Sequence, residues 1–190
     1  MLRKIASTAN DSLNEWSLGV ATVGEETARP ERTPTSYRII RRIIGALHPA
    51  STDHFVDIGC GRGRVLCVAA LHPLARVAGV EINEVSAAAA KSNLARMRWQ
   101  RAKSWSITAG SAIDYDYAGA TILYFYNSVQ GDLLRQLLAR IAATATAPLR
   151  FVYVNPVCRD LVSEAGWLGS PEVLERDQQD EPFALLYRSR

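Results

Sequence analysis

The residue types best suited to chemistry lie in one short stretch that runs from Asp57 to Gly63. An acidic residue near the end of an apolar segment is followed by Gly59, Cys60, Gly61 and Gly63, so that glycine occurs at alternate positions. Glycine has no Cβ, so it adopts positive φ and lets a ligand approach the backbone closely. The amides that open the following helix favour a carboxylate or a phosphate. We therefore expect Asp57 and these four residues to bind a ligand.

The kind of ligand follows from what this stretch contains and lacks. The dinucleotide-binding fingerprint G-x-G-x-x-G requires a third glycine three residues after the second, and Arg64 occupies that position here. Asp57 instead suits a ligand that carries positive charge as well as a carboxylate. S-adenosylmethionine has both, because it contains an ammonium, a sulfonium and a carboxylate. An NAD(P)-binding oxidoreductase is the alternative enzyme, and a catalytically inert module that binds S-adenosylmethionine is a third reading.

Residues at the ends of the next strand-like segments complete the predicted cofactor pocket. Glu81 ends the second of these segments, and a carboxylate there can accept hydrogen bonds from both ribose hydroxyls. Ile82 beside it is expected to press on one face of the adenine. Ser111 and Ala112 follow the third segment and are expected near the exocyclic amine of adenine. Together these residues predict an adenosine-binding edge.

Two candidate catalytic residues end the fourth strand-like segment, at the edge where open α/β sheets bind ligands. The ring of Tyr126 is expected to border the transferred methyl group and to steady its positive charge. The side-chain carbonyl of Asn127 is expected to orient an amine, and Asn127 is also expected to contact the cofactor. No metal site is expected, because the three histidines and three cysteines show no ligand spacing.

The elements that must position these residues alternate along the chain. Short β-branched or aromatic runs alternate with helical patterns, which indicates an α/β fold with a parallel sheet and helices on both faces. One helical pattern is expected to place Leu133, Leu134, Leu137, Leu138 and Ile141 on one face. The strand-like runs are 55–58, 77–81, 105–108, 121–126 and 151–154, and the helical stretches are 63–72, 84–98, 129–143 and 157–166.

The two ends of the chain depart from this alternation. Runs 171–176 and 182–188 are joined by polar residues and predict a hairpin, so that one strand of the sheet runs backwards. Pro182 fits only at the start of its strand or on an edge. We expect residues 33–190 to form the ligand-binding domain and residues 1–32 to form an arm or lid. Thr33 followed by Pro34 predicts the start of the first helix of the domain.

With its glycine-rich turn and its acid after the second strand, the sequence resembles the class I S-adenosylmethionine-dependent methyltransferases. The resemblance covers residues 33–190 and implies a Rossmann-like three-layer sandwich whose seven-stranded sheet has an antiparallel seventh strand. Within the class, the chain is similar to small, uncharacterised bacterial members. The Asp-x-Gly-x-Gly-x-Gly-Arg variant also resembles the non-SET protein lysine methyltransferases, which implies a protein lysine or another amine as methyl acceptor.

The residues after the fourth strand depart from the pattern of the nucleic-acid amino-methyltransferases. These enzymes carry Asn or Asp followed by two prolines and an aromatic residue, whereas this chain has Asn127-Ser128-Val129-Gln130. A protein or a small molecule is therefore favoured over nucleic acid as the methyl acceptor. The formal net charge of +3 also gives no sign of a polyanionic partner.

Length and composition favour one globular domain. The chain has 190 residues, 48% of them hydrophobic and 22% charged, which excludes a disordered chain. No apolar stretch approaches the roughly 20 residues of a membrane helix, and no secretory signal is recognisable. We expect a reduced, cytoplasmic protein. The oligomeric state does not follow from the sequence.

Overall fold

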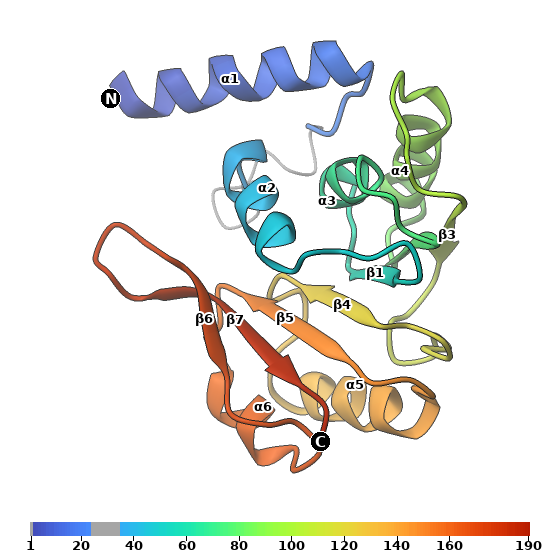
Figure 1. Ribbon diagram of the computed structural model, residues 1–190, viewed down its shortest axis with the longest axis vertical. Coiled ribbons are helices and arrows are strands. Elements are labelled where there is room, and N and C mark those ends of the chain that lie inside the picture. The colour runs from blue at the N-terminus through green and yellow to red at the C-terminus, as the bar shows by residue number, and fades with distance from the viewer. Residues whose placement is uncertain (1, 24–34) are drawn as a thin grey trace.

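A seven-stranded sheet in the order β3-β2-β1-β4-β5-β7-β6 forms the centre of the computed structural model, which describes residues 2–23 and 35–190 (Figure 1). The first five strands pair in parallel, and β7 is antiparallel to both β5 and β6. This confirms the predicted α/β sandwich with a reversed strand from the C-terminal hairpin. The strands are β1 (His54–Ile58), β2 (Arg76–Glu81), β3 (Trp105–Ala109), β4 (Ile122–Phe125), β5 (Arg150–Val154), β6 (Glu172–Arg176) and β7 (Pro182–Arg188).

Helices cover both faces of the sheet, and a further helix lies outside one layer (Figure 1). Successive strand residues point to opposite faces, so Phe55 belongs to the core beneath α2, α3 and α4, whereas Val56 belongs to the core beneath α5 and α6. The strands β1 and β4 are buried on both faces. The helices are α1 (Leu2–Leu18), α2 (Tyr37–Ala46), α3 (Arg64–Ala69), α4 (Glu84–Arg96), α5 (Gly131–Thr144) and α6 (Arg159–Glu164).

Some predicted details of these elements differ from the structure. Leu133 is 50% exposed, because the buried stripe of α5 follows the i, i+3, i+4, i+7 spacing from Leu134 and leaves the preceding residue on its flank. Strand β4 ends at Phe125, so Tyr126 lies just beyond it. Helix α2 begins at Tyr37, with Ser36 as its N-cap. The predicted helix start at Thr33 and Pro34 lies outside the described residues.

Helix α1 is anchored to the domain by Arg64, the residue that replaces the third glycine of the dinucleotide fingerprint. Its guanidinium is 2.9 Å from Asp11 Oδ2 and 3.3 Å from Glu15 Oε1. It also donates to Thr22 Oγ1 at 2.8 Å and lies 4.8 Å from the centre of the Tyr37 ring. Because Arg64 is only 6% exposed, these contacts replace the water that a buried cation loses.

Asn93 of α4 makes a second connection between the N-terminal segment and the glycine-rich loop. Its side chain accepts a hydrogen bond from the Ala21 amide and donates to the carbonyls of Ala21 and Arg62, each at 2.9 Å. Asn93 is 1% exposed, so its amide is satisfied by backbone on both sides. The segment after α1 is thereby joined to the loop that follows β1. A role of residues 1–32 as an arm or lid stays a prediction.

The buried position of Arg64 predicts a large effect of its removal. Arg64→Met leaves Asp11 and Glu15 without their cation, and the loss of hydrogen bonds to charged groups should lower the free energy of unfolding by about 1.5–3 kcal/mol. Urea titration measures this change. The matched control is Arg41→Met, because Arg41 contacts α1 only at an exposed position, through Asn14 Oδ1 at 3.0 Å. An equal loss in the two variants would contradict the anchoring role of Arg64.

Candidate functional site

The glycine-rich loop joins β1 to α3 at the carboxyl edge of the sheet. All three glycines have positive φ, +76° at Gly59, +52° at Gly61 and +83° at Gly63, as the sequence predicts. A Cβ at Gly59 would lie 2.7 Å from Ser128 Cβ, and a Cβ at Gly63 would lie 3.1 Å from Ala90 Cβ. A Cβ at Gly61 meets no atom of the described residues within 4 Å. Packing therefore accounts for two of the glycines, and Gly61 faces open space.

The amides of the loop hold its shape. Those of Gly59 and Cys60 both donate to the Val80 carbonyl, at 2.9 and 3.1 Å. The Gly63 amide donates to the Cys60 carbonyl at 2.9 Å, and the Gly61 amide donates to Glu81 Oε2 at 2.8 Å. These four amides are thus engaged within the chain, and two carboxylates, those of Asp57 and Glu81, lie beside the loop.

Asp57, two residues before Gly59, is buried beneath this loop without a partner. It is 3% exposed, and its carboxyl makes no hydrogen bond or ion pair with any described residue. Burial and the nearby charge of Glu81 raise the pKa of Asp57 well above its usual value. Tyr124, its register partner in β4, is also fully buried, and its hydroxyl has no hydrogen-bond partner among the described residues. A carboxyl buried in this way is costly unless a ligand supplies the missing partner.

Glu81 ends β2 beside the loop, where its carboxylate already makes two hydrogen bonds. Oε2 accepts the Gly61 amide at 2.8 Å and Oε1 accepts the Asn83 amide at 2.9 Å. Each oxygen has a further lone pair, so the predicted contact with ribose hydroxyls is compatible with this arrangement. Ile82 is 74% exposed, which leaves its side chain free to cover a ring. The roles of both residues toward adenosine stay predictions.

Ser111 and Ala112 lie just after β3, next to the end of β2. The amide of Gly110 donates to the Glu81 carbonyl at 2.9 Å, which holds the two strand ends together. Ser111 Oγ accepts the Ile113 amide at 3.2 Å, and the Ala112 carbonyl accepts the Tyr117 hydroxyl at 2.8 Å. The structure therefore places the residues predicted for ribose and adenine along one edge. Their contact with adenine stays a prediction.

Cys60 fills space beneath the loop. Its side chain packs against β2, since a Cβ at Gly79 would lie 2.7 Å from Cys60 Sγ. Burial raises the pKa of the Cys60 thiol well above its usual value, and the charges of Asp57 and Glu81 raise it further. The thiol is therefore protonated at neutral pH. The contact of Cys60 with a cofactor stays a prediction.

The two candidate catalytic residues lie on opposite faces of the sheet. Tyr126 packs with the core beneath α2, and its ring lies edge-on to that of Phe183 with centroids 6.3 Å apart. Asn127 has a φ of +43°, a left-handed conformation that asparagine tolerates. Its Oδ1 accepts a hydrogen bond at 3.1 Å from the hydroxyl of Tyr153, on the other face. The two side chains thus flank the end of β4 from both sides and do not form one cluster.

Sequence patterns do not single out several residues that shape this site. Ser128 donates to the Ile58 carbonyl at 3.3 Å and limits the space at Gly59. No motif marks Ser128 or Asn93, because each acts through residues distant in the chain. Among residues 2–23 and 35–190 there is no group of three or more His, Cys, Asp or Glu that could hold a metal ion. In the same residues no helix is long and apolar enough to cross a membrane.

Solved structures resemble this fold at low sequence identity. An RNA methyltransferase from Salinibacter ruber, solved with S-adenosyl-L-homocysteine, aligns with a TM-score of 0.59 and 18% identity over 83% of this chain and 92% of its own. A TehB-like SAM-dependent methyltransferase from Corynebacterium glutamicum aligns with a TM-score of 0.59 and 16% identity, over 80% and 86% of the two chains. The magnesium protoporphyrin IX methyltransferase of Synechocystis PCC 6803, solved with bound SAM, gives 0.52 and 12%, over 80% and 76%.

Sequence comparison adds no closer relative. No protein-family model matches the chain, and no curated protein sequence matches it. The resemblance to the solved structures is therefore one of fold, carried by the strand order and the reversed β7. The chain has the fold of the class I S-adenosylmethionine-dependent methyltransferases.

Proposed function

We propose that this protein binds S-adenosylmethionine at the glycine-rich loop and transfers its methyl group to an acceptor that is not identified. The observation that carries the proposal is the buried carboxyl of Asp57, which lies without a partner next to Glu81. A cationic ligand would stabilise both carboxylates, and the open space at Gly61 would admit it. The fold supports the same conclusion, since it is shared with methyltransferases.

The same buried carboxyl argues against a dinucleotide. A pyrophosphate at this turn would bring no positive charge to the buried carboxyl of Asp57, whereas Glu81 is compatible with either ligand, because an acid after the second strand also binds the ribose of NAD. Arg64 does not supply this charge, because its guanidinium is paired with Asp11 and Glu15. An NAD(P)-binding oxidoreductase is therefore the weaker hypothesis. Titration with S-adenosylmethionine and with NAD tests the choice, and tight binding of NAD alone would refute the proposal.

Each residue of the site has a proposed task. Asp57 would accept hydrogen bonds from the ammonium, Glu81 would bind the ribose hydroxyls, and Ile82 would cover the adenine. Ser111 and Ala112 would flank its exocyclic amine. When bound, the sulfonium would supply an activated methyl carbon, to which the acceptor's lone pair bonds while the carbon–sulfur bond breaks and its electrons remain on sulfur.

The acceptor is proposed to be an amine, of a protein lysine or of a small molecule. An amine attacks only after it has lost its proton, so a lysine would need its pKa of about 10.4 lowered near the site. Asn127 would orient the amine with the second lone pair of Oδ1, and Tyr126 would border the methyl group from the opposite face. Holding donor and acceptor in line is the main contribution of such a site, up to about 7–11 kcal/mol.

Transfer of tritium from labelled S-adenosylmethionine would separate catalysis from binding alone. Lysate proteins, RNA and metabolites serve as acceptor pools, with the protein heated to unfolding as the control. Label in the protein or metabolite pool supports the proposal. Binding of the cofactor without label in any pool would favour the inert module.

The raised pKa of Asp57 predicts a pH-dependent gain in stability for Asp57→Asn. The folded protein holds the Asp57 proton more tightly than the unfolded chain does, so this group's contribution is full below about pH 4 and is lost as pH rises through the raised pKa. The asparagine side chain of the variant does not titrate. The free energy of unfolding of the variant should therefore rise relative to that of the parent between pH 4.5 and pH 8, as urea titration at each pH would measure.

Asp114→Asn is the matched control for this experiment, because Asp114 is an exposed acid near the same edge. It should follow the parent at every pH. If the difference in the free energy of unfolding between Asp57→Asn and the parent stayed constant with pH, the pKa of Asp57 would not be raised in the folded protein.

Gly61→Ala should abolish or strongly weaken binding of S-adenosylhomocysteine, because its methyl group would enter the space proposed for the ligand. Gly166→Ala is the matched control, since Gly166 also has a positive φ, +77°, and a Cβ there also meets no described atom within 4 Å. Both variants should lose about 1 kcal/mol of stability from the backbone strain. Isothermal titration calorimetry measures binding, and equal affinities in the two variants would place the ligand elsewhere.

A further inference from the structure

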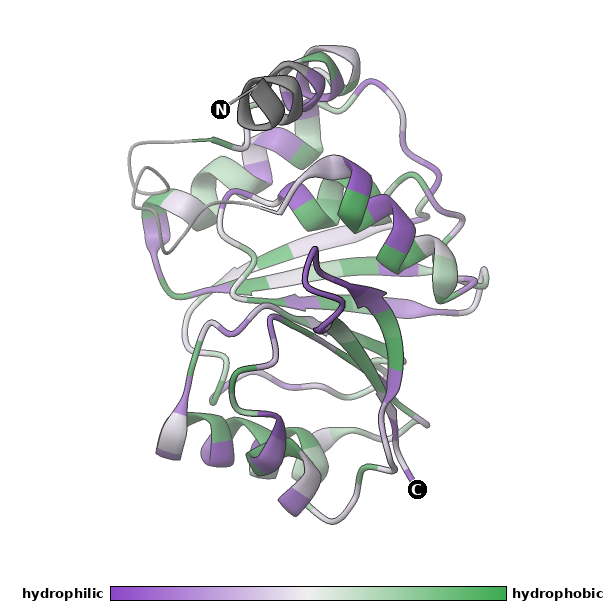
Figure 2. Ribbon diagram, turned by 90° about the vertical axis from the view of Figure 1, so that its left-hand side faces the viewer, coloured by the Kyte–Doolittle hydropathy of each residue, from purple (hydrophilic) through white to green (hydrophobic). Residues whose placement is uncertain are grey.

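A second cavity lies between α2 and the β6–β7 hairpin. Its volume is about 770 Å³, within the range of small-molecule sites. Because β7 runs opposite to β5 and β6, the turn of the hairpin stands at the edge where β4 and β5 end. Figure 1 shows the hairpin passing below the end of α2 with its turn extending to the left of that helix, and Figure 2 shows the turn as a hydrophilic projection. We call this cavity the hairpin groove.

Three arginines line the hairpin groove, from two separate elements. Arg42 of α2 is fixed by Glu175, with 3.1 Å between Nε and Oε2, yet its side chain remains 58% exposed. Arg176, at the end of β6, is held near Asp180 at 3.8 Å and is 49% exposed. Arg38 is exposed and makes no ion pair with any described residue. Two carboxylates, those of Glu175 and Asp177, also line the groove. The three guanidinium groups outnumber them, and Arg38 has no carboxylate partner among the described residues.

The floor of the groove is apolar and lies next to Tyr126. Ile39, Leu174 and Phe183 line it, and all three pack against the core beneath α2. The ring of Phe183 contacts that of Tyr126, with centroids 6.3 Å apart. One ring, that of Phe183, therefore separates the groove from Tyr126, just after the end of β4.

We infer that the hairpin groove binds an organic anion, with its carboxylate or phosphate on Arg38, Arg42 and Arg176 and its apolar body on the floor beside Phe183. Guanidinium groups recognise both kinds of anion through paired hydrogen bonds. The identity of this anion rests on the proposed function. If the protein is a methyltransferase, the anion is the methyl acceptor itself, a small molecule with an acidic group at one end and its nucleophile toward Tyr126.

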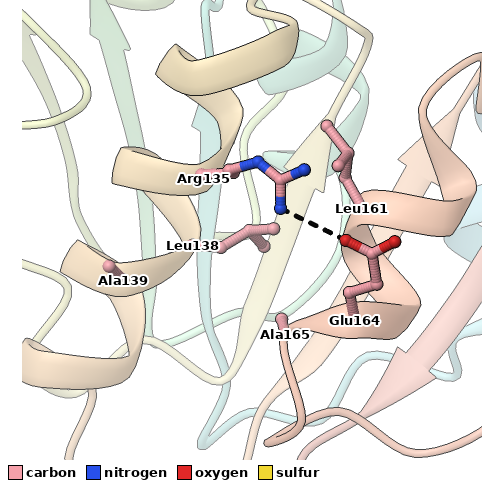
Figure 3. Close-up of a pocket in the computed structure, with 6 residues that line it drawn as sticks. All are labelled: Arg135, Leu138, Ala139, Leu161, Glu164 and Ala165. Carbon is pink, nitrogen blue, oxygen red and sulfur yellow. Dashed lines mark hydrogen bonds and ion pairs between the residues drawn. The ribbon is translucent and has the colours of Figure 1, made fainter.

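A cavity on the opposite face of the sheet provides a control. It is about 220 Å³ in volume and lies between α5 and α6, on the opposite face of the sheet (Figure 3). Its arginine, Arg135, is paired with Glu164 at 3.2 Å. Removing this charge should not affect the hairpin groove, so Arg135→Gln is a matched control for the loss of one exposed arginine.

The test uses three naphthalene probes of similar shape, measured by isothermal titration calorimetry on the full chain. Naphthalene-2-carboxylate and 2-naphthyl phosphate carry the two kinds of anion, and 2-naphthylmethanol is neutral. At least one anion should bind about tenfold more tightly than the alcohol, which corresponds to one hydrogen bond between charged groups. The anion that binds more tightly shows whether the acidic group of the natural ligand is a carboxylate or a phosphate.

The variants then locate the binding. Arg38→Gln should weaken the anion about tenfold and leave the alcohol unchanged, because Arg38 supports no other part of the fold. Arg135→Gln should change neither. The inference is overturned if no anion binds, if the alcohol binds equally well, or if Arg38→Gln behaves like Arg135→Gln.

A separate titration with S-adenosylhomocysteine distinguishes this inference from the proposed function. Anion binding that depends on Arg38, in a protein that does not bind S-adenosylhomocysteine, would leave the groove established and refute the methyltransferase. Binding of S-adenosylhomocysteine without anion binding would refute the groove alone.

Discussion

The site depends on a carboxyl group that the fold buries without a partner. Asp57 lies next to the end of β1, where its neighbours in the sheet are Gly79 and Tyr124, and neither offers it a hydrogen bond. Glu81, at the end of the next strand, adds a second negative charge. Desolvation and like charge both act against ionisation of Asp57. A ligand that brings positive charge would remove this cost, which is why a cation fits the site and a second anion does not.

The other contacts of the site hold the loop above this carboxyl. The Val80 carbonyl accepts two loop amides, and Glu81 accepts a third. Arg64 opens α3 directly after the loop and is held from outside by α1. The glycine that a dinucleotide fold places here serves close packing, whereas this chain uses the position to attach its N-terminal segment. The geometry of the loop and the docking of α1 are therefore linked through one residue.

The sequence predicted the parts of the structure that local patterns encode. Alternating strands and helices, the reversed strand that begins at Pro182, and the positive φ of Gly59, Gly61 and Gly63 all follow from short-range chemistry. The contacts of Arg64 with Asp11 and Glu15 could not be predicted, because they join residues about 50 positions apart. In the sequence, Arg64 is notable only because it occupies the position of the third glycine of the dinucleotide fingerprint.

The positions of the two candidate catalytic residues also could not be predicted from the sequence. Tyr126 and Asn127 are adjacent in the chain, and their placement on opposite faces depends on where β4 ends and on the left-handed conformation of Asn127. The hairpin groove is a further case, since Arg176 is far along the chain from Arg38 and Arg42 of α2 and meets them only in the folded protein.

The most direct test of the account is the titration of the Asp57 carboxyl itself, by carbon NMR of protein labelled at aspartate, with Asp57→Asn used to assign the signal. The account predicts a pKa well above the usual aspartate value in the free protein, and a fall of that pKa when S-adenosylmethionine is bound. An Asp57 that titrates like an exposed aspartate in both states would contradict it.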